Sequence, residues 1–170
     1  MKFILFILIL FSSCIKEKEE ELLWKEKVRK GDYYFSCKNI DMALKFWIES
    51  LEYKKTPLIF EKIVASFIIK NDFENAKKYA KTGLTYFNKN DNLLFNLGLA
   101  QFFLGEYDDS LKTMDQLIRQ NRYYPDAHYL KGMIYEKKGY SEEAKREYIE
   151  ELNVNPGSKK AWRKIKEMGK

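Results

Sequence analysis

A small residue, usually glycine, returns along this chain at an almost constant spacing. The positions are Gly31, Val64, Gly98 and Gly132, which gives steps of 33, 34 and 34 residues. A second series of small residues keeps the same steps: Ala43, Ala76, Ser110 and Ala144. Self-similarity at a period of about 34 residues is typical of stacked helix pairs, because a single pair cannot bury its own apolar face. The spacing therefore predicts an array of helical hairpins.

The last repeat shows why the hairpin should be helical. Apolar residues in 125–156 recur at helical spacing on both sides of Gly139. Gly132 lies inside the first predicted helix, where glycine costs about 1 kcal/mol relative to alanine. We therefore expect a close helix crossing there, with Ala144 at the crossing and Tyr148 interlocking beside it. No stretch has the alternation and turn residues of a β-hairpin, which predicts an all-α protein.

Several residues of this repeat form a known signature: Gly132, Tyr135, Gly139, Ala144, Tyr148 and Pro156. With them the repeat resembles the tetratricopeptide repeat family. The resemblance implies a right-handed α-solenoid of four helix pairs followed by a C-terminal capping helix. The expected repeats are 24–56, 57–90, 91–124 and 125–158, and the expected cap is 159–170. Arrays of this family bind other proteins and peptides without catalysing a reaction.

The extreme N-terminus has the layout of an export signal. Lys2 precedes nine consecutive large apolar residues, and Ser12, Ser13 and Cys14 follow them. The apolar run is too short to span a bilayer well, since about 20 apolar residues are needed. The segment favours a signal peptide, and the alternatives are a retained N-terminal anchor and a plain signal peptide with an incidental cysteine.

The cysteine after two serines resembles the lipobox of bacterial lipoproteins, of which relaxed versions are familiar in spirochaetes. The resemblance implies a signal peptide at 1–13, a lipidated Cys14 and a short charged tether at 14–23. We thus expect an exported protein anchored by lipid to a bacterial membrane. The periplasmic face of the outer membrane is the first candidate, and the cell surface is the second.

The inventory of reactive residues argues against catalysis. His128 is the only histidine, so a metal site with two imidazoles is excluded, and a packing role is expected for it. The chain has no glycine-rich phosphate loop and no nucleophile elbow. Cys37 has no partner for a disulfide if Cys14 is lipidated, and we expect it to be a partly buried, inert thiol. The sequence predicts a protein that is not an enzyme and has no metal or cofactor.

The net charge of +6 comes mainly from lysine and does not indicate a nucleic-acid partner. The densest basic group lies in the final predicted helix: Lys159, Lys160, Arg163, Lys164, Lys166 and Lys170. Two interpretations remain open for it. The lysines can form the solvated face of a cap, or they can contact an anionic partner or lipid headgroups.

In the family, the first helix of each repeat lines a concave groove. Transferring those positions gives an apolar stripe as the candidate partner-binding groove: Ile68, Ile69, Phe95, Leu99, Phe102, Phe103, Tyr129 and Met133. Three coverings of the stripe are open: mutual burial between first helices, a partner segment, and self-association into a homodimer. The lysine and asparagine clamp for a peptide carboxylate is absent, because Val28 and Asp32 occupy two of its places.

These features together predict a membrane-anchored scaffold that binds another envelope protein or peptide through the groove. The plan is similar to that of lipoproteins that assist outer-membrane protein assembly and of pilotins that deliver secretins. Two other functions fit the same sequence: a regulator of a cell-wall enzyme, and a surface-exposed lipoprotein that contacts a host.

Overall fold

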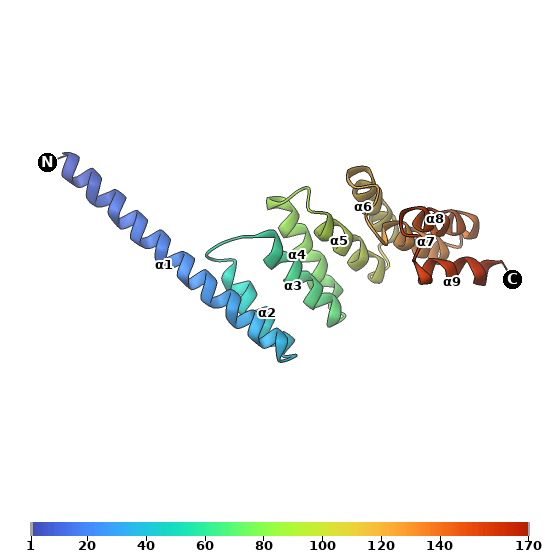
Figure 1. Ribbon diagram of the computed structural model, residues 1–170, viewed down its shortest axis with the longest axis horizontal. Helices are drawn as coiled ribbons and strands as arrows, with labels where there is room; N and C mark the ends of the chain where they lie inside the picture. Colours follow the sequence, from blue (N-terminus) through green and yellow to red (C-terminus); the bar gives the residue numbers. More distant parts are fainter. Residues whose placement is uncertain (1, 170) are drawn as a thin grey trace. The chain divides into compact units, whose positions relative to one another are not determined.

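The computed structural model describes the backbone of residues 2–169 and the side chains of residues 16–169. This part of the chain contains nine α-helices and no strand (Figure 1). The helices are α1 (Lys2–Ser36), α2 (Ile40–Ser50), α3 (Pro57–Ile69), α4 (Phe73–Tyr86), α5 (Asp91–Phe103), α6 (Tyr107–Gln120), α7 (Ala127–Lys138), α8 (Ser141–Val154) and α9 (Lys159–Met168). The predicted all-α fold of paired helices is confirmed.

The turn inside each helix pair has the same backbone conformation. One residue per turn has a positive φ angle: Lys38 at 60°, Asn71 at 57°, Gly105 at 78° and Gly139 at 81°. These positions repeat with the period of the sequence. A left-handed residue ends a helix sharply, and in each pair the next helix begins two residues later. The local turn therefore recurs even where lysine or asparagine replaces glycine.

The chain divides into two compact units, Met1–Ser66 and Phe67–Lys170, and the boundary lies within α3. In the first unit α2 packs along the C-terminal part of α1 (Figure 1). Tyr34 of α1 and Phe46 of α2 stack with ring centroids 5.4 Å apart. Lys27 and Glu49 join the same two helices by an ion pair of 2.6 Å.

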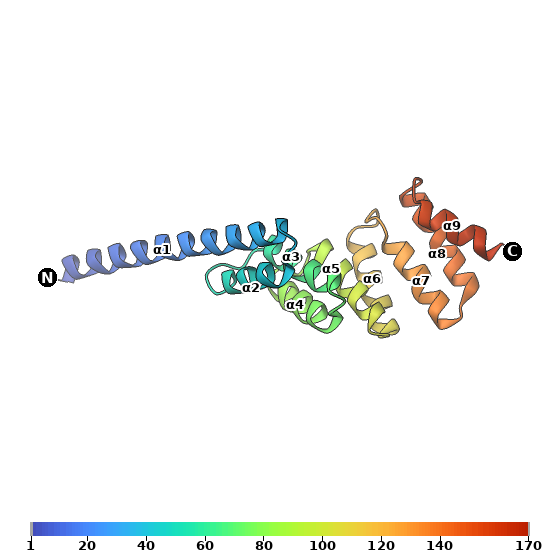
Figure 2. The same cartoon turned by 90° about the horizontal axis from the view of Figure 1, so that it is seen from below.

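In the second unit each helix from α4 onward packs against the next one. Figure 2 shows α7 and α8 side by side, joined by the short turn at Gly139. The core of α5, α6 and α7 contains seven buried apolar residues: Leu94, Phe102, Met114, Leu117, Ala127, Leu130 and Ile134. A smaller cluster of Ala144, Tyr148 and Ala161 joins α8 to α9.

The repeated glycines make room for a large side chain of the second helix. A Cβ atom added to Gly31, Gly98 or Gly132 would collide with Trp47, Met114 or Tyr148, respectively. Each of these large residues stands four positions after the small residue of its repeat. The side chain nearest to Gly132 is therefore Tyr148 rather than Ala144, which the register alone had placed at the crossing.

Ser110 occupies the alanine position of the third repeat and remains fully buried. Its hydroxyl donates a hydrogen bond of 2.7 Å to the carbonyl oxygen of Gly98. The bond satisfies a polar group that would otherwise be costly to bury. A serine can thus replace alanine here because the facing glycine leaves its carbonyl within reach.

The predicted lipidation residue, Cys14, lies outside the residues whose side chains the structure describes. The segment 14–23 belongs to the continuous helix α1. Among the described residues, no helix combines the length and the apolar character needed to cross a membrane.

Candidate functional site

All eight predicted groove residues lie in the second unit, on the end of α3 and on α5 and α7. Two of them are exposed: Ile69 keeps 56% of its surface and Phe103 keeps 51%. Five are half-buried: Ile68, Phe95, Leu99, Tyr129 and Met133. Phe102 is only 6% exposed. The stripe is therefore less open than the sequence suggested.

Phe102 belongs to the core and not to a surface groove. It packs among the buried residues of α5, α6 and α7, with Tyr107 at a centroid distance of 5.9 Å. Its neighbour Phe103 points in another direction, because consecutive helix residues are about 100° apart around the axis. The sequence could not tell which of the two adjacent phenylalanines faces the core.

Mutual burial accounts for most of the half-buried positions. Phe95, Leu99 and Met133 pack against the core cluster of α5, α6 and α7. Phe95 also contacts Tyr124, with ring centroids 5.4 Å apart. Tyr129 packs against Tyr148 in the cluster of α8 and α9. These side chains form the inner wall of the second unit rather than a continuous apolar surface.

The two exposed residues of the predicted groove lie where first helices end. Phe103, at the end of α5, stacks nearly parallel on Phe73, at the start of α4, with centroids 4.5 Å and planes 13° apart. Ile69 ends α3, four residues before Phe73. We call Ile69, Phe73 and Phe103 the apolar edge. Phe73 is a residue of this surface that the predicted groove did not include.

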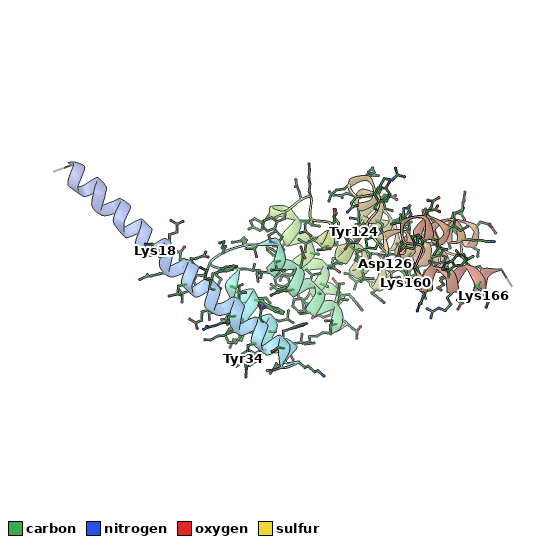
Figure 3. The ribbon with its side chains drawn as sticks, in the orientation of Figure 1. Lys18, Tyr34, Tyr124, Asp126, Lys160 and Lys166 are labelled. Carbon is green, nitrogen blue, oxygen red and sulfur yellow. The ribbon has the colours of Figure 1, made fainter. Side chains whose placement is uncertain are left out.

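Polar and charged contacts cover the fourth-repeat part of the predicted groove. Lys160 of α9 pairs with Asp126 at 2.7 Å, and its ammonium lies 4.6 Å from the ring centre of Tyr129. Lys160 and Asp126 are both labelled in Figure 3. Glu136 accepts hydrogen bonds from the Tyr148 hydroxyl at 2.9 Å and from Lys164 at 2.7 Å. Helix α9 thus closes this end of the groove.

A buried carboxylate holds the start of α7. Glu151 of α8 has no exposed surface, and it accepts hydrogen bonds from the backbone amides of Asp126 and Tyr129. Burial, together with the negative charge of Asp126, raises the pKa of Glu151 above its ordinary value. The carboxylate thus caps α7 from a neighbouring helix. The Asp126 side chain, at the N-cap position itself, makes no capping bond.

His128 takes part in a structural ion-pair network, as its position in the repeat suggested. Its Nδ1 atom lies 2.7 Å from Oε2 of Glu147. Lys131 bridges Glu147 at 2.7 Å and Asp115 at 2.9 Å, so the network joins α6, α7 and α8. Burial alone would raise the pKa of Glu147, but the hydrogen bonds from His128 and Lys131 outweigh it and lower that pKa.

Replacing Glu147 with glutamine should therefore destabilise the protein in a pH-dependent way. The lowered pKa of Glu147 means that its charge stabilises the folded state above the pKa of the unfolded chain, and that this stability is lost as the pH falls. At pH 7 we expect a loss of about 1–3 kcal/mol, the range for a broken hydrogen bond to a charged group. Urea denaturation between pH 7 and pH 3 should show this loss shrinking. Glu142→Gln, at an exposed position of the same helix, is the control, and a pH-independent loss in Glu147→Gln would contradict the assignment.

The first unit contains a hollow that the sequence did not predict. It has a volume of about 270 Å³ and is lined by Asp32, Phe35, Trp47, Lys62, Ala65 and Ser66. Asp32 accepts hydrogen bonds from the Trp47 indole at 2.9 Å and from Lys62 at 2.5 Å. The Ser66 hydroxyl is buried and has no hydrogen-bond partner among the described residues.

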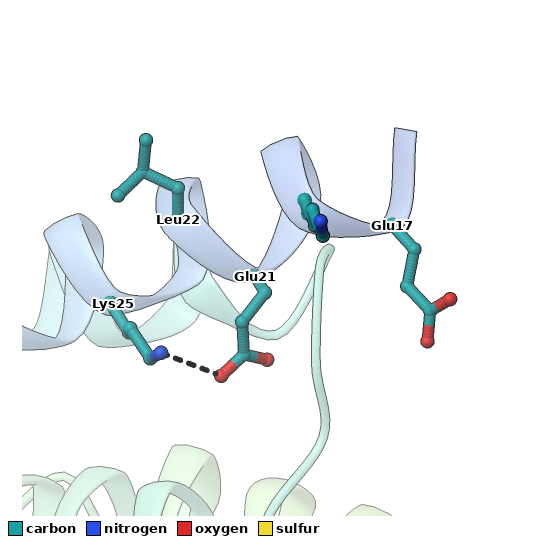
Figure 4. Close-up of a pocket in the computed structure, with 5 residues that line it drawn as sticks. Glu17, Glu21, Leu22 and Lys25 are labelled. Atoms are coloured by element: carbon teal, nitrogen blue, oxygen red, sulfur yellow. Dashed lines mark ion pairs between the residues drawn. The ribbon is translucent and has the colours of Figure 1, made fainter. Parts of the chain in front are cut away.

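Other surface features of the described residues lack the parts of a reactive site. A depression on α1 is lined by Glu17, Lys18, Glu21, Leu22 and Lys25 (Figure 4). All five residues come from one helix, so no second element encloses it. Residues 16–169 contain no group of three acidic, histidine or cysteine side chains placed to hold a metal ion. Cys37 is exposed, which corrects the expectation of partial burial.

Comparison with known proteins agrees with the helix pairing. The sequence of residues 67–162, more than half of the chain, matches the model of a tetratricopeptide repeat family. Nothing matched in a search of curated protein sequences.

Solved structures share the fold at low sequence identity. One crystal structure of the MamA protein is 19% identical with a TM-score of 0.78, over 86% of this chain and 80% of that one. YrrB, described as a tetratricopeptide repeat protein with an unusual peptide-binding site, is 16% identical with a TM-score of 0.77, over 92% and 87% of the two chains. The first such domain of RPAP3, bound to an HSP90 peptide, has 19% identity and a TM-score of 0.63, over 66% and 90%. With more than half of its length matched by the family model, this chain belongs to the tetratricopeptide repeat family.

Proposed function

We propose that this protein is a non-catalytic scaffold, anchored by lipid to a bacterial envelope membrane, that captures an apolar segment of another envelope protein. The observation that supports the capture role is the apolar edge of the second unit. Phe103 keeps half of its surface although it stacks on Phe73, and Ile69 is similarly exposed. Exposed aromatic and aliphatic side chains grouped in this way are typical of a docking site.

The contacts favour an apolar ligand over an acidic peptide tail. The RPAP3 structure contains a peptide with the sequence SRMEEVD. In this chain Asp32 is an acidic residue at a place where related grooves bind a carboxylate, and its own charge is engaged by Lys62. An extended or helical segment with large apolar side chains suits the edge better.

Site-specific crosslinking tests the capture role. A photoreactive amino acid at Ile69 should crosslink a discrete envelope protein in living cells. Phe103→Ser should reduce this product by about 30-fold, because a central aromatic contributes about 2 kcal/mol or more to an interface. Tyr123→Ser is the matched control, because Tyr123 is also exposed but lies between α6 and α7. Equal capture by both variants would exclude the apolar edge as the site, and a product with twice the mass of the chain would assign it to a homodimer.

The anchor is tested separately. Cys14→Ala should abolish the incorporation of labelled fatty acid and release the protein from the membrane fraction, whereas Cys37→Ala should change neither. Stable anchoring is expected only when two or more acyl chains are attached. If Cys14→Ala remains membrane-bound at unchanged mass, the N-terminal apolar segment is a retained anchor.

The location of the protein separates the remaining functions. Protease added to intact cells should leave the chain uncut if it faces the periplasm, where it would serve an envelope assembly or regulate a cell-wall enzyme. Digestion of the chain on intact cells would instead place it at the cell surface, as a host-contacting lipoprotein requires.

A further inference from the structure

Helix α9 has two chemically different faces. Ala161, Ile165 and Met168 pack toward Ala144 and Tyr148 of α8. The opposite side carries Lys159, Trp162, Arg163 and Lys166, which we call the outer face of α9. Their spacing of three, four and seven residues places them on one side of the helix. At the flank of the helix, with Ile165, they border an open depression of about 540 Å³, which, like the one on α1, no second element encloses.

Trp162 is exposed at a repeat position that is otherwise covered. Counting back by 34 residues leads to His128, Leu94 and Phe60. Leu94 and Phe60 are buried and His128 is half-buried. Trp162, in contrast, keeps 59% of its surface. Trp162 is therefore a large aromatic side chain left open at a position that the earlier repeats cover.

Lys166 opposes the docking of another helix on this face. The equivalent positions are Gly132, Gly98 and Val64, all of which are buried. The two glycines admit a large side chain from the second helix of their pair. A lysine at this position holds an approaching helix away. The outer face is therefore suited to contact with a partner that can bind one indole ring and the long cationic side chains around it.

The cationic side chains of the outer face make no close ion pair with other described residues. Lys160 and Lys164 turn inward and pair with Asp126 and Glu136. Lys159 and Lys166 have no ion pair with any described residue, and Lys166 is labelled near the end of α9 in Figure 3. Arg163 has only a long contact of 3.9 Å, to the exposed Glu167. The outer face therefore offers positive charge to an external anion.

We propose that the outer face of α9 binds the headgroup surface of an anionic phospholipid bilayer. Tryptophan prefers the headgroup level of a membrane, where its ring and its N–H group are both satisfied. Lysine and arginine around it attract the phosphates of anionic lipids. The contact is separate from lipid attachment at Cys14 and would bring the second unit itself to a membrane surface.

Vesicle binding tests the proposal. The full chain carrying Cys14→Ala, which excludes acylation, is mixed with vesicles of phosphatidylcholine alone or with one-third phosphatidylglycerol. The N-terminal apolar segment can contact both kinds, so the difference between them reports the electrostatic contact. We expect at least tenfold stronger binding to the anionic vesicles, and a decline as salt rises.

Matched variants locate the contact. The triple variant Lys159→Glu, Arg163→Glu, Lys166→Glu should lose the preference for anionic vesicles. The control Lys81→Glu, Lys89→Glu, Lys137→Glu has the same charge change at exposed positions of the second unit and should weaken it less than threefold. Trp162→Ser should weaken anionic binding about fivefold or more. Equal behaviour of the two triple variants would overturn the proposal.

A spectroscopic measurement remains informative if a variant folds poorly. The chain labelled with 5-fluorotryptophan contains three probes, Trp24, Trp47 and Trp162. Anionic vesicles should broaden and shift the Trp162 signal selectively relative to phosphatidylcholine vesicles. An unchanged Trp162 signal would overturn the proposal.

Binding of a polyglutamate peptide to the outer face without vesicle binding would also overturn it, because this result would assign the face to an acidic protein. Phe103→Ser should bind vesicles normally. Loss of vesicle binding by the outer face can thus be distinguished from loss of the capture role of the apolar edge.

Discussion

Replacing Phe102 with alanine is expected to lower the free energy of unfolding by about 3–5 kcal/mol, the range for deleting a large aromatic core side chain. Phe102 is 6% exposed and lies among the buried residues that join α5, α6 and α7. The truncation leaves a cavity that packed helices can fill only in part. Urea denaturation followed by helical circular dichroism measures the loss.

The adjacent Phe103 is the control with the same chemistry. Phe103→Ala should cost about 1–2 kcal/mol, because half of its side chain is already in water and only the stack on Phe73 is lost. A cost for Phe103 equal to that for Phe102 would show that the apolar edge is part of the core. The pair thus separates a stability residue from a docking residue at neighbouring positions.

The second large effect is expected at a helix crossing. Gly132→Ala should destabilise the protein by about 1–3 kcal/mol through overpacking, although alanine is favoured over glycine in a helix by about 1 kcal/mol. The added Cβ meets the ring of Tyr148, which is fully buried and whose hydroxyl is bound to Glu136. The ring therefore has no room to turn away.

Gly98→Ala is the matched substitution at the equivalent position of the third repeat. There the added Cβ meets the terminal methyl group of Met114, which can move by rotation of a flexible side chain. We expect this change to be nearly neutral, within about 0.5 kcal/mol, since helix propensity offsets the adjustment. Melting temperatures in the reverse order would refute the packing assigned to these glycines.

The repeat architecture could be predicted because its determinants are local and periodic. Positions such as Gly98 and Gly132 mark close crossings, and the turn at Gly139 ends one helix and begins the next within a few residues. Each repeat carries the same information, so substitutions such as Val64 for glycine do not hide the period. The sequence alone was sufficient for the all-α class and the pairing of helices.

The candidate site could be predicted only as a set of positions. Whether a groove residue is open depends on what the neighbouring helices place over it, and this information is distributed along the chain. Tyr124 reaches Phe95 from the loop before α7, and Lys160 reaches Tyr129 from α9. Neither contact has a local sequence signal. The hollow beside Trp47 escaped prediction for the same reason.

The sequence by itself determined the period, the helices and the positions that the family uses for binding, because helix propensity, turns and apolar spacing act over a few residues. Only the tertiary structure decided that Phe102 is core while Phe103 is surface, and that Lys160 is paired while Lys166 is free of described ion pairs. A side chain's exposure and its partners result from contacts between helices, which a one-dimensional pattern does not specify.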